Sequence, residues 1–139
     1  MPFVRLSLLQ GKSPAYLRAL ADRVHEALVE AFEVPHDDRF QVIHQHAESE
    51  FIFDDQYLGI QRSRDQVFIS VTAGRARSAA AKASFYRCLV EKLSVSLGLR
   101  PEDVMVTITM NTAEDWSFGC GVAQMLAGNT PVPGHRQEA

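Results

Sequence analysis

The 139-residue chain contains only two cysteines, no excess of basic residues and no long hydrophobic run. Cys88 falls in a helical pattern and Cys120 lies between two glycines, so the spacing of a disulfide framework is absent. The formal net charge of −3 indicates no basic surface for nucleic acid. No apolar stretch approaches the ~20 residues that cross a membrane, and the first residues lack the basic and apolar regions of a signal peptide. We therefore expect a cytoplasmic protein with reduced thiols that binds neither nucleic acid nor membrane.

The overall composition of the sequence is that of an ordinary globular domain. Hydrophobic residues make up 46% of the chain and charged residues 22%, and both values are typical of soluble domains. The length fits one domain with a substantial core. We expect this domain to span residues 1–128. A flexible or subunit-contacting tail should follow at 129–139, where there are two prolines and few apolar residues.

The first half of the chain has the pattern of a strand–helix–strand unit. Apolar and polar side chains alternate over residues 4–8, which predicts a half-buried strand. Ser13-Pro14 is a favourable helix start, and apolar residues with helical spacing continue to about Phe32. The helix should stop before Pro35, because the residue preceding a proline disfavours the α conformation. Alternation then predicts a second strand over residues 40–45.

The second half repeats this order about 65 residues later. A nearly continuous apolar run at 67–72 predicts a strand buried on both faces. Ser78 is a favourable N-cap, and the amphipathic pattern after it closes at Gly98. Another strand is expected at 104–108, so the pseudo-repeats span about 2–46 and 66–109.

Two such units predict an α/β fold. A crossover of this length favours a parallel pair of strands within each unit. Together the units would form a four-stranded sheet with two helices on one face. The other face would be open and apolar, and since a bare apolar face requires a partner, we expect an oligomer. The charged segment 47–65 separates the units and could contain one short strand around Phe51-Ile52-Phe53.

Pro2 is the first residue with catalytic potential. Initiator methionine is usually removed before a small residue such as proline, which would leave the secondary amine of Pro2 at the start of a core strand. An α-amino group has an unperturbed pKa near ~8, so it can exchange protons or attack a carbonyl near neutrality. Many chains begin with Met-Pro, so this feature alone indicates little.

Three further side chains could act with such an amine. Arg75 and Arg77 follow the third expected strand and could converge on one carboxylate, or they could be solvated residues of a loop that precedes a helix. Asp38 could act on a substrate, or it could cap the following strand or pair with Arg39.

Two histidines could indicate a metal. His44 and His46 lie on one face of the second strand, as ligands do in some metal sites. No third ligand is evident in the sequence. We therefore interpret both as polar ends of a strand and expect no metal. Cys120 has no adjoining basic residue, so we interpret it as a structural thiol.

Four motifs occur in order on this repeat. They are Pro2 after Met1, Asp38-Arg39-Phe40, Arg75-Ala76-Arg77-Ser78, and Asn-Thr-Ala-Glu-Asp-Trp-Ser-Phe-Gly over residues 111–119. Together they resemble the tautomerase superfamily, and within it the malonate semialdehyde decarboxylase family most closely. The likeness covers roughly residues 2–128. The region 47–67 and Cys120 depart from the family pattern, which leaves the exact substrate open.

The resemblance implies a fold, an assembly and a set of site residues. It implies a homotrimer without metal or organic cofactor. It implies that Pro2 is catalytic, that Asp38 activates or orients water, and that Arg75 and Arg77 bind a substrate carboxylate. The apolar wall of the site would be formed by Trp116 and Phe118, together with Met125 or Leu126.

These observations predict a small enzyme that decarboxylates a short 3-oxo acid similar to malonate semialdehyde. Hydration of unsaturated acids would be a side activity. One alternative with the same fold is a keto–enol tautomerase that acts on a 2-oxo acid such as phenylpyruvate. The other alternative is a binding protein of this fold without catalytic activity.

Overall fold

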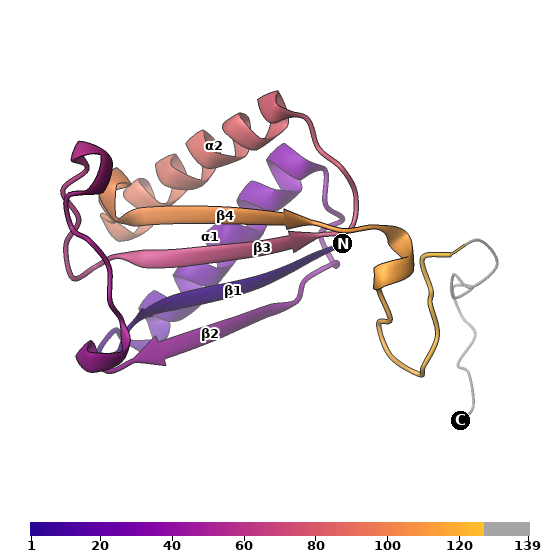
Figure 1. Cartoon of the computed structure of the whole chain (residues 1–139), viewed down its shortest axis with the longest axis horizontal. Coiled ribbons are helices and arrows are strands. Elements are labelled where there is room, and N and C mark those ends of the chain that lie inside the picture. Colours follow the sequence, from indigo (N-terminus) through magenta and orange to yellow (C-terminus); the bar gives the residue numbers. More distant parts are fainter. Residues whose placement is uncertain (127–139) are drawn as a thin grey trace.

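The protein is a single four-stranded sheet covered on one face by two long helices (Figure 1). The computed structural model describes residues 1–126, and the tail expected at 129–139 lies outside them. The helices are α1 (Pro14–Phe32) and α2 (Ala79–Leu97). The strands are β1 (Pro2–Leu9), β2 (Gln41–His46), β3 (Val67–Ala73) and β4 (Val104–Met110), arranged in the order β2-β1-β3-β4. No helix within residues 1–126 is long and apolar enough to cross a membrane.

The predicted helix boundaries are confirmed, and their caps explain them. The Ser13 side chain accepts a hydrogen bond from the amide of Tyr16, and Ser78 does the same for Ala81. Each cap satisfies a backbone donor that the first turn of a helix leaves free. Both helices end in a left-handed residue, Glu33 after α1 and Gly98 after α2, which turns the chain back toward the sheet.

The two halves form equivalent units. Both helices contain 19 residues, and α2 begins 65 positions after α1. β1 pairs with β2 in parallel, and β3 pairs with β4 in the same way, as the sequence predicts. The central pair, β1 and β3, is antiparallel, with Pro2 opposite Ala73. The start of β1 therefore lies at the same end of the sheet as the last residues of β3 and β4.

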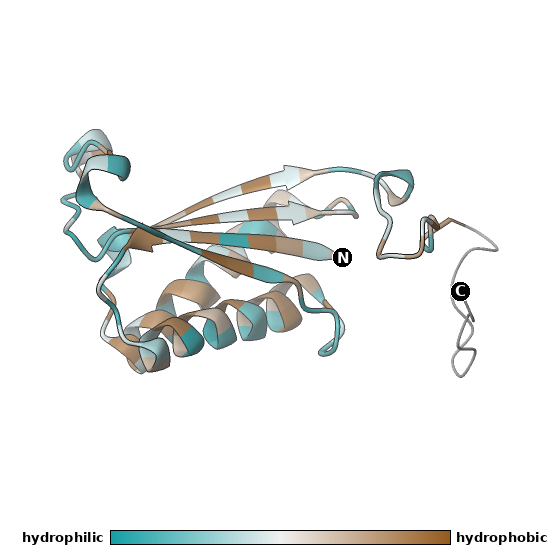
Figure 2. Ribbon diagram, turned by 90° about the horizontal axis from the view of Figure 1, so that it is seen from below, coloured by the Kyte–Doolittle hydropathy of each residue, from teal (hydrophilic) through white to brown (hydrophobic). Residues whose placement is uncertain are grey.

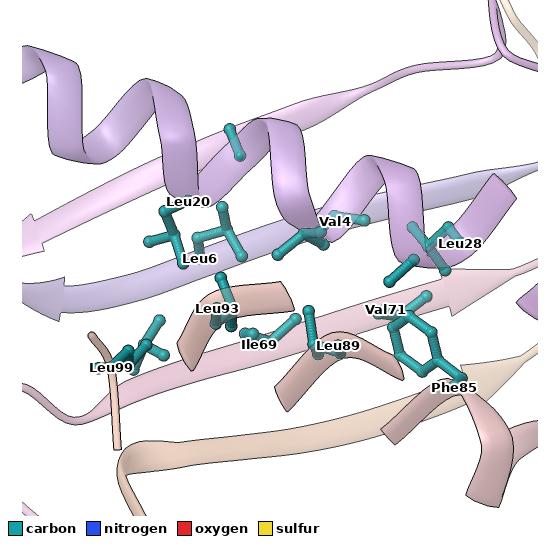
Figure 3. Packing of buried hydrophobic residues seen from close by; sticks show 14 of the residues in the cluster. Val4, Leu6, Leu20, Leu28, Ile69, Val71, Phe85, Leu89, Leu93 and Leu99 are labelled. Carbon is teal, nitrogen blue, oxygen red and sulfur yellow. The ribbon is translucent and has the colours of Figure 1, made fainter. Parts of the chain in front are cut away.

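The core lies between the sheet and the helices (Figure 3). Val4 and Leu6 of β1 and Ile69 and Val71 of β3 point toward the helices and are at most 1% exposed. They meet a set of equally buried helix residues, namely Leu20 and Leu28 of α1 and Phe85, Leu89 and Leu93 of α2. Burial of each of these large side chains contributes about 1.5–3 kcal/mol to folding. This packing holds the strand that begins at Pro2.

The opposite face of the sheet differs from the prediction. Buried and partly exposed residues alternate along β3, so this strand is not buried on both faces in the single chain. Apolar Phe68 and Met105 lie on the uncovered face together with Arg5, Ser70 and other polar residues, and Figure 2 shows the helices on the other side only. The prediction of an apolar open face is therefore wrong, because hydroxyl and charged side chains occupy about as many of its positions.

The segment between the units contains no strand within its described residues 47–66. It has two short 3-10 turns, Glu48–Glu50 and Tyr57–Gly59. The ring of Phe51 packs on Phe68 with 4.5 Å between centroids, and Phe53 lies at 6.1 Å from the same ring. This aromatic cluster holds the segment on the open face, at the end of the sheet away from Pro2 (Figure 1).

Candidate active site

Three segments that are distant in sequence meet at the end of the sheet where β1 begins. The amide of Gly74 donates to the carbonyl of Met1 at 3.1 Å, and the amide of Asn111 donates to the carbonyl of Ala73 at 2.9 Å. The start of the chain, the turn after β3 and the segment after β4 are thereby joined near the amino terminus marked in Figure 1. Pro2 itself is buried.

Asp38 faces the amino terminus of the chain. Its Oδ2 lies 2.7 Å from the Met1 amine, and the two side chains are only 18% and 15% exposed. The Asp38 amide donates to the carbonyl of Pro35 at 3.0 Å, so a tight turn holds the residue. The alternative that Asp38 pairs with Arg39 is wrong, because Arg39 forms its ion pair with Asp22 of α1.

The aromatic residues of the 111–119 motif cover this terminus. The Trp116 indole donates to Asn111 Oδ1 at 2.6 Å, and its ring stacks on Phe118 with 5.4 Å between centroids. Phe118 also contacts Phe40 at 5.6 Å. The row of three rings includes Phe40, which our sequence reasoning did not assign to the site although it belongs to the Asp38-Arg39-Phe40 motif.

Gly74 allows Trp116 to approach the start of the chain. A Cβ atom at this position would lie 2.4 Å from the indole nitrogen and 2.7 Å from the terminal methyl of Met1. Both distances are far shorter than a van der Waals contact. A glycine is thus required here for close approach of the indole and not for an unusual backbone angle.

The turn after Phe118 is held by a buried glutamine. Gln124, which is 8% exposed, accepts from the Phe118 amide at 2.9 Å and donates to the Gly119 carbonyl at 2.8 Å. Cys120 is exposed and lies in the left-handed region with φ of 60°. Met125 and Leu126, named by the resemblance as wall residues, are 40% and 39% exposed.

The guanidinium groups of Arg75 and Arg77 converge on one acceptor, as one sequence interpretation expected, but this acceptor is a backbone carbonyl and not a carboxylate. The Nη2 atoms of both guanidinium groups donate to the carbonyl of Phe32 at 3.2 Å. The Arg77 Nε atom is buried and has no hydrogen-bond partner. Burial, and then the adjacent charge of Arg75, lower the pKa of Arg77. Two neighbouring cations with a free buried donor would be stabilised by an anion.

The described residues contain no obvious metal centre. His44 Nε2 lies 3.1 Å from Arg5 Nη1, and His46 stacks on Phe51 at 5.9 Å. In the described part of the chain, residues 1–126, no group of three or more His, Cys, Asp or Glu side chains is arranged to hold a metal ion.

The position equivalent to Asp38 in the second unit is Asp103, and it has a different environment. Asp103 is fully buried and accepts hydrogen bonds from the amide and the hydroxyl of Ser63, at 2.6 and 2.7 Å. Here the chain that precedes β3 fills the space that the amino terminus occupies in the first unit. Of these two equivalent aspartates, only Asp38 faces the start of the chain.

Comparison with known proteins agrees with this geometry. A tautomerase enzyme family model matches residues 2–61, and a second tautomerase enzyme model matches residues 38–119. The probable tautomerase YrdN of Bacillus subtilis (strain 168) is 41% identical over 128 residues, which is 92% of this chain and 98% of the relative.

Solved structures have the same architecture. A crystal structure of malonate semialdehyde decarboxylase superimposes with a TM-score of 0.86 and 38% identity, covering 91% of this chain and 98% of that one. A symmetric trimer of wild-type fused 4-OT matches with a TM-score of 0.73 at 23% identity, covering 91% and 98% of the two chains. The chain belongs to the tautomerase family of enzymes.

Proposed function

We propose that this protein is a cofactor-independent decarboxylase of a short 3-oxo acid of the malonate semialdehyde type. Its reacting group would be the secondary amine of Pro2 after removal of Met1. The observation that supports the proposal most directly is the 2.7 Å pair between the terminal amine and Asp38, beside the Trp116 ring. The choice of decarboxylation is supported by the similarity to malonate semialdehyde decarboxylase over nearly the whole chain.

Met1 indicates where a substrate would lie. Its amine contacts Asp38, and its terminal methyl packs over Gly74. Removal of this residue would expose the Pro2 nitrogen and free the space between Asp38 and Trp116. A small acid could then enter the position of Met1.

The proposed reaction begins with the substrate carboxylate. Arg75 and Arg77 would bind it by charge-assisted hydrogen bonds in exchange for their bonds to the Phe32 carbonyl. They would hold the bond to be broken perpendicular to the carbonyl plane. A protonated Pro2 amine would donate to the oxo oxygen and stabilise the enolate that forms as carbon dioxide leaves. The enolate carbon then takes a proton from solvent to give the aldehyde.

The surroundings of the amine decide its protonation. A neighbouring Asp38 carboxylate favours the cation, whereas burial disfavours it, as would guanidinium groups that bind the substrate beside the amine. The decarboxylase needs the cation, so we expect the effect of Asp38 to dominate. Trp116 and Phe118 would exclude water from the carboxylate and favour loss of its charge.

The proposal includes a homotrimer and a hydratase side activity. The trimer is supported by the assembly of fused 4-OT, a protein of the same fold, and by the uncovered sheet face. The crystallised relative is described as having both decarboxylase and hydratase activities, and an Asp38 carboxylate beside a cationic amine could orient water for the second reaction.

A second candidate function is supported by the relatives from Bacillus subtilis, which are named as probable tautomerases. With a neutral amine, Pro2 would act as a base and transfer a proton between carbon and oxygen of a 2-oxo acid such as phenylpyruvate. A binding protein without turnover is the third possibility.

A substrate panel distinguishes these functions. Protein confirmed by mass to begin at Pro2 is assayed with malonate semialdehyde, phenylpyruvate and an acetylenic 3-halo acid. We expect release of carbon dioxide from malonate semialdehyde to be the fastest reaction. Faster ketonisation of phenylpyruvate would support the tautomerase instead, and no turnover of any of the three would support the binding protein.

A further inference from the structure

The loop that carries Asp38 forms hydrogen bonds with α1 on both sides of that residue. On one side, His25 Nε2 donates to the carbonyl of His36 at 2.7 Å, and His25 is only 5% exposed. On the other side, Arg39 Nη2 donates to Asp22 Oδ1 at 2.7 Å. Asp38 lies between these two attachments. Its backbone therefore has little freedom to move relative to the helix.

The Arg39 attachment continues into the next strand. Arg39 Nε donates to Gln41 Oε1 at 2.8 Å, and Gln41 Nε2 donates to the Ala21 carbonyl at 2.8 Å. The hydrogen bond from Arg39 holds the pKa of Asp22 below its ordinary value. Since Arg39 and Asp22 are 28% and 30% exposed, their pair is expected to contribute little to the free energy of folding. Its main consequence is geometric.

The second unit of the fold serves as an internal comparison. At the positions 65 residues later, Val90 replaces His25 and Val104 replaces Arg39, while Arg87 replaces Asp22. The second unit nevertheless forms the same strand–helix–strand structure with the same strand register. The polar attachments are thus not required to build the unit. They occur only in the half where the carboxylate faces the terminal amine.

We infer that Arg39, through its ion pair with Asp22, is a positioning residue that holds the Asp38 carboxylate against the terminal amine. This inference rests on the proposed function, in which that amine is the reacting group. Arg39 has its polar contacts with Asp22 and Gln41 and acts only through the loop. Its loss should let the carboxylate move away while the fold persists.

The test is the pKa of the Pro2 nitrogen in isotope-labelled protein that lacks Met1, measured by nuclear magnetic resonance. Two effects of Arg39→Gln have opposite signs. Removal of a nearby positive charge alone would raise the pKa of the amine, whereas withdrawal of the Asp38 carboxylate would lower it. We expect a fall of about 0.5–1 pH unit and a loss of roughly 10-fold to 100-fold in kcat/KM for the best substrate of the panel.

Two variants provide the controls. Arg18 also donates to Asp22 Oδ1, at 3.1 Å, but is 75% exposed and belongs to α1 itself, so Arg18→Gln should change neither quantity. The charge reversal Asp22→Arg with Arg39→Asp retains an ion pair between loop and helix. This double variant should return the pKa of the Pro2 amine and kcat/KM most of the way to the values of the unmodified protein. It also keeps the test valid if Arg39→Gln folds poorly.

The outcomes separate this inference from the proposed function. Asp38→Asn must lower the pKa of the Pro2 nitrogen; if it does not, the pairing of Asp38 with the amine fails and the positioning role fails with it. If Asp38→Asn lowers the pKa but Arg39→Gln raises it or leaves it unchanged, the proposed function stands and the positioning role is overturned. Failure of the charge reversal to restore a lowered pKa would also overturn it.

Discussion

At the scale of single residues, the proposed site would combine one carboxylate with two guanidinium groups. Asp38 pairs with the terminal amine, while Arg75 and Arg77 share the Phe32 carbonyl at the end of α1. A carbonyl at a helix C-terminus carries partial negative charge and is a weaker partner for guanidinium than a carboxylate. In the proposed function, the arginines would exchange this weaker partner for a substrate anion.

We predict that Arg75→Ala and Arg77→Ala each reduce transition-state stabilisation by about 2–5 kcal/mol, the range for truncating one partner of a charge pair that the bound substrate would bury. The measurement is kcat/KM for malonate semialdehyde. Arg87→Ala, on the outer surface of α2, is the matched control and should keep the activity of the unmodified protein. Unchanged kcat/KM in both site variants would mean that these arginines do not bind the substrate carboxylate.

At the scale of elements, the duplicated unit has two aspartates in equivalent places with different partners. Asp38 contacts the amine at the start of the chain, and Asp103 is buried against Ser63. Removal of Met1, as proposed, would leave room for a ligand beside Asp38, whereas the chain itself encloses Asp103. The two carboxylates should consequently differ in what they contribute to folding and to turnover.

Asp103→Asn is predicted to lower the free energy of unfolding by about 1.5–3 kcal/mol, since the amide nitrogen that replaces one oxygen of this fully buried carboxylate cannot accept a hydrogen bond from Ser63. Asp38→Asn should cost less stability but most of the turnover. Denaturant unfolding and kcat/KM are compared for both variants. The different roles of the two aspartates would be refuted if Asp38→Asn were the more destabilising change. They would also be refuted if Asp103→Asn alone abolished turnover in folded protein.

Much of this architecture could be predicted from the sequence because local signals determine it. Ser13, Ser78 and Gly98 mark helix ends by capping chemistry, and alternation marks the strands. The antiparallel pairing of β1 with β3 could not be predicted, because it depends on contacts between the two units.

The ion-pair partner of Arg39 could not be predicted from the sequence either. Asp37 and Asp38 adjoin Arg39 in sequence, but Asp22 on α1 binds it. The need for glycine at position 74 could not be predicted either, because it depends on where Trp116 lies in the folded chain.

At the scale of the whole molecule, one sheet face remains uncovered in the single chain. Val42 and Met105 lie on that face and are 37% and 49% exposed. Val95, on the outer surface of α2, is 85% exposed. If the open face forms the contacts of a trimer, a charge added at Val42 or Met105 should weaken the trimer. A charge added at Val95 should not.

We predict that the protein is a trimer at micromolar concentration and that Val42→Lys or Met105→Asp shifts it toward monomer, because the added charge would be buried without an opposite charge beside it. Arg5, the residue paired with Val42 on β1, is itself cationic. Val95→Asp should remain trimeric. Light scattering after gel filtration measures the mass. A stable monomer in the unmodified protein, or trimers in both open-face variants, would refute this assembly.

The central claim is that the amine at the start of the chain, beside Asp38, is the reacting group. It is tested most directly by comparing the chain that begins at Pro2 with the same chain that retains Met1, each confirmed by intact mass. In the retained form the Pro2 nitrogen is an amide, and Met1 contacts both Asp38 and Gly74. We predict that turnover of malonate semialdehyde falls by roughly 10²–10⁴-fold in the chain with Met1, the contribution of a positioned acid or base. Equal turnover by the two chains would contradict the claim.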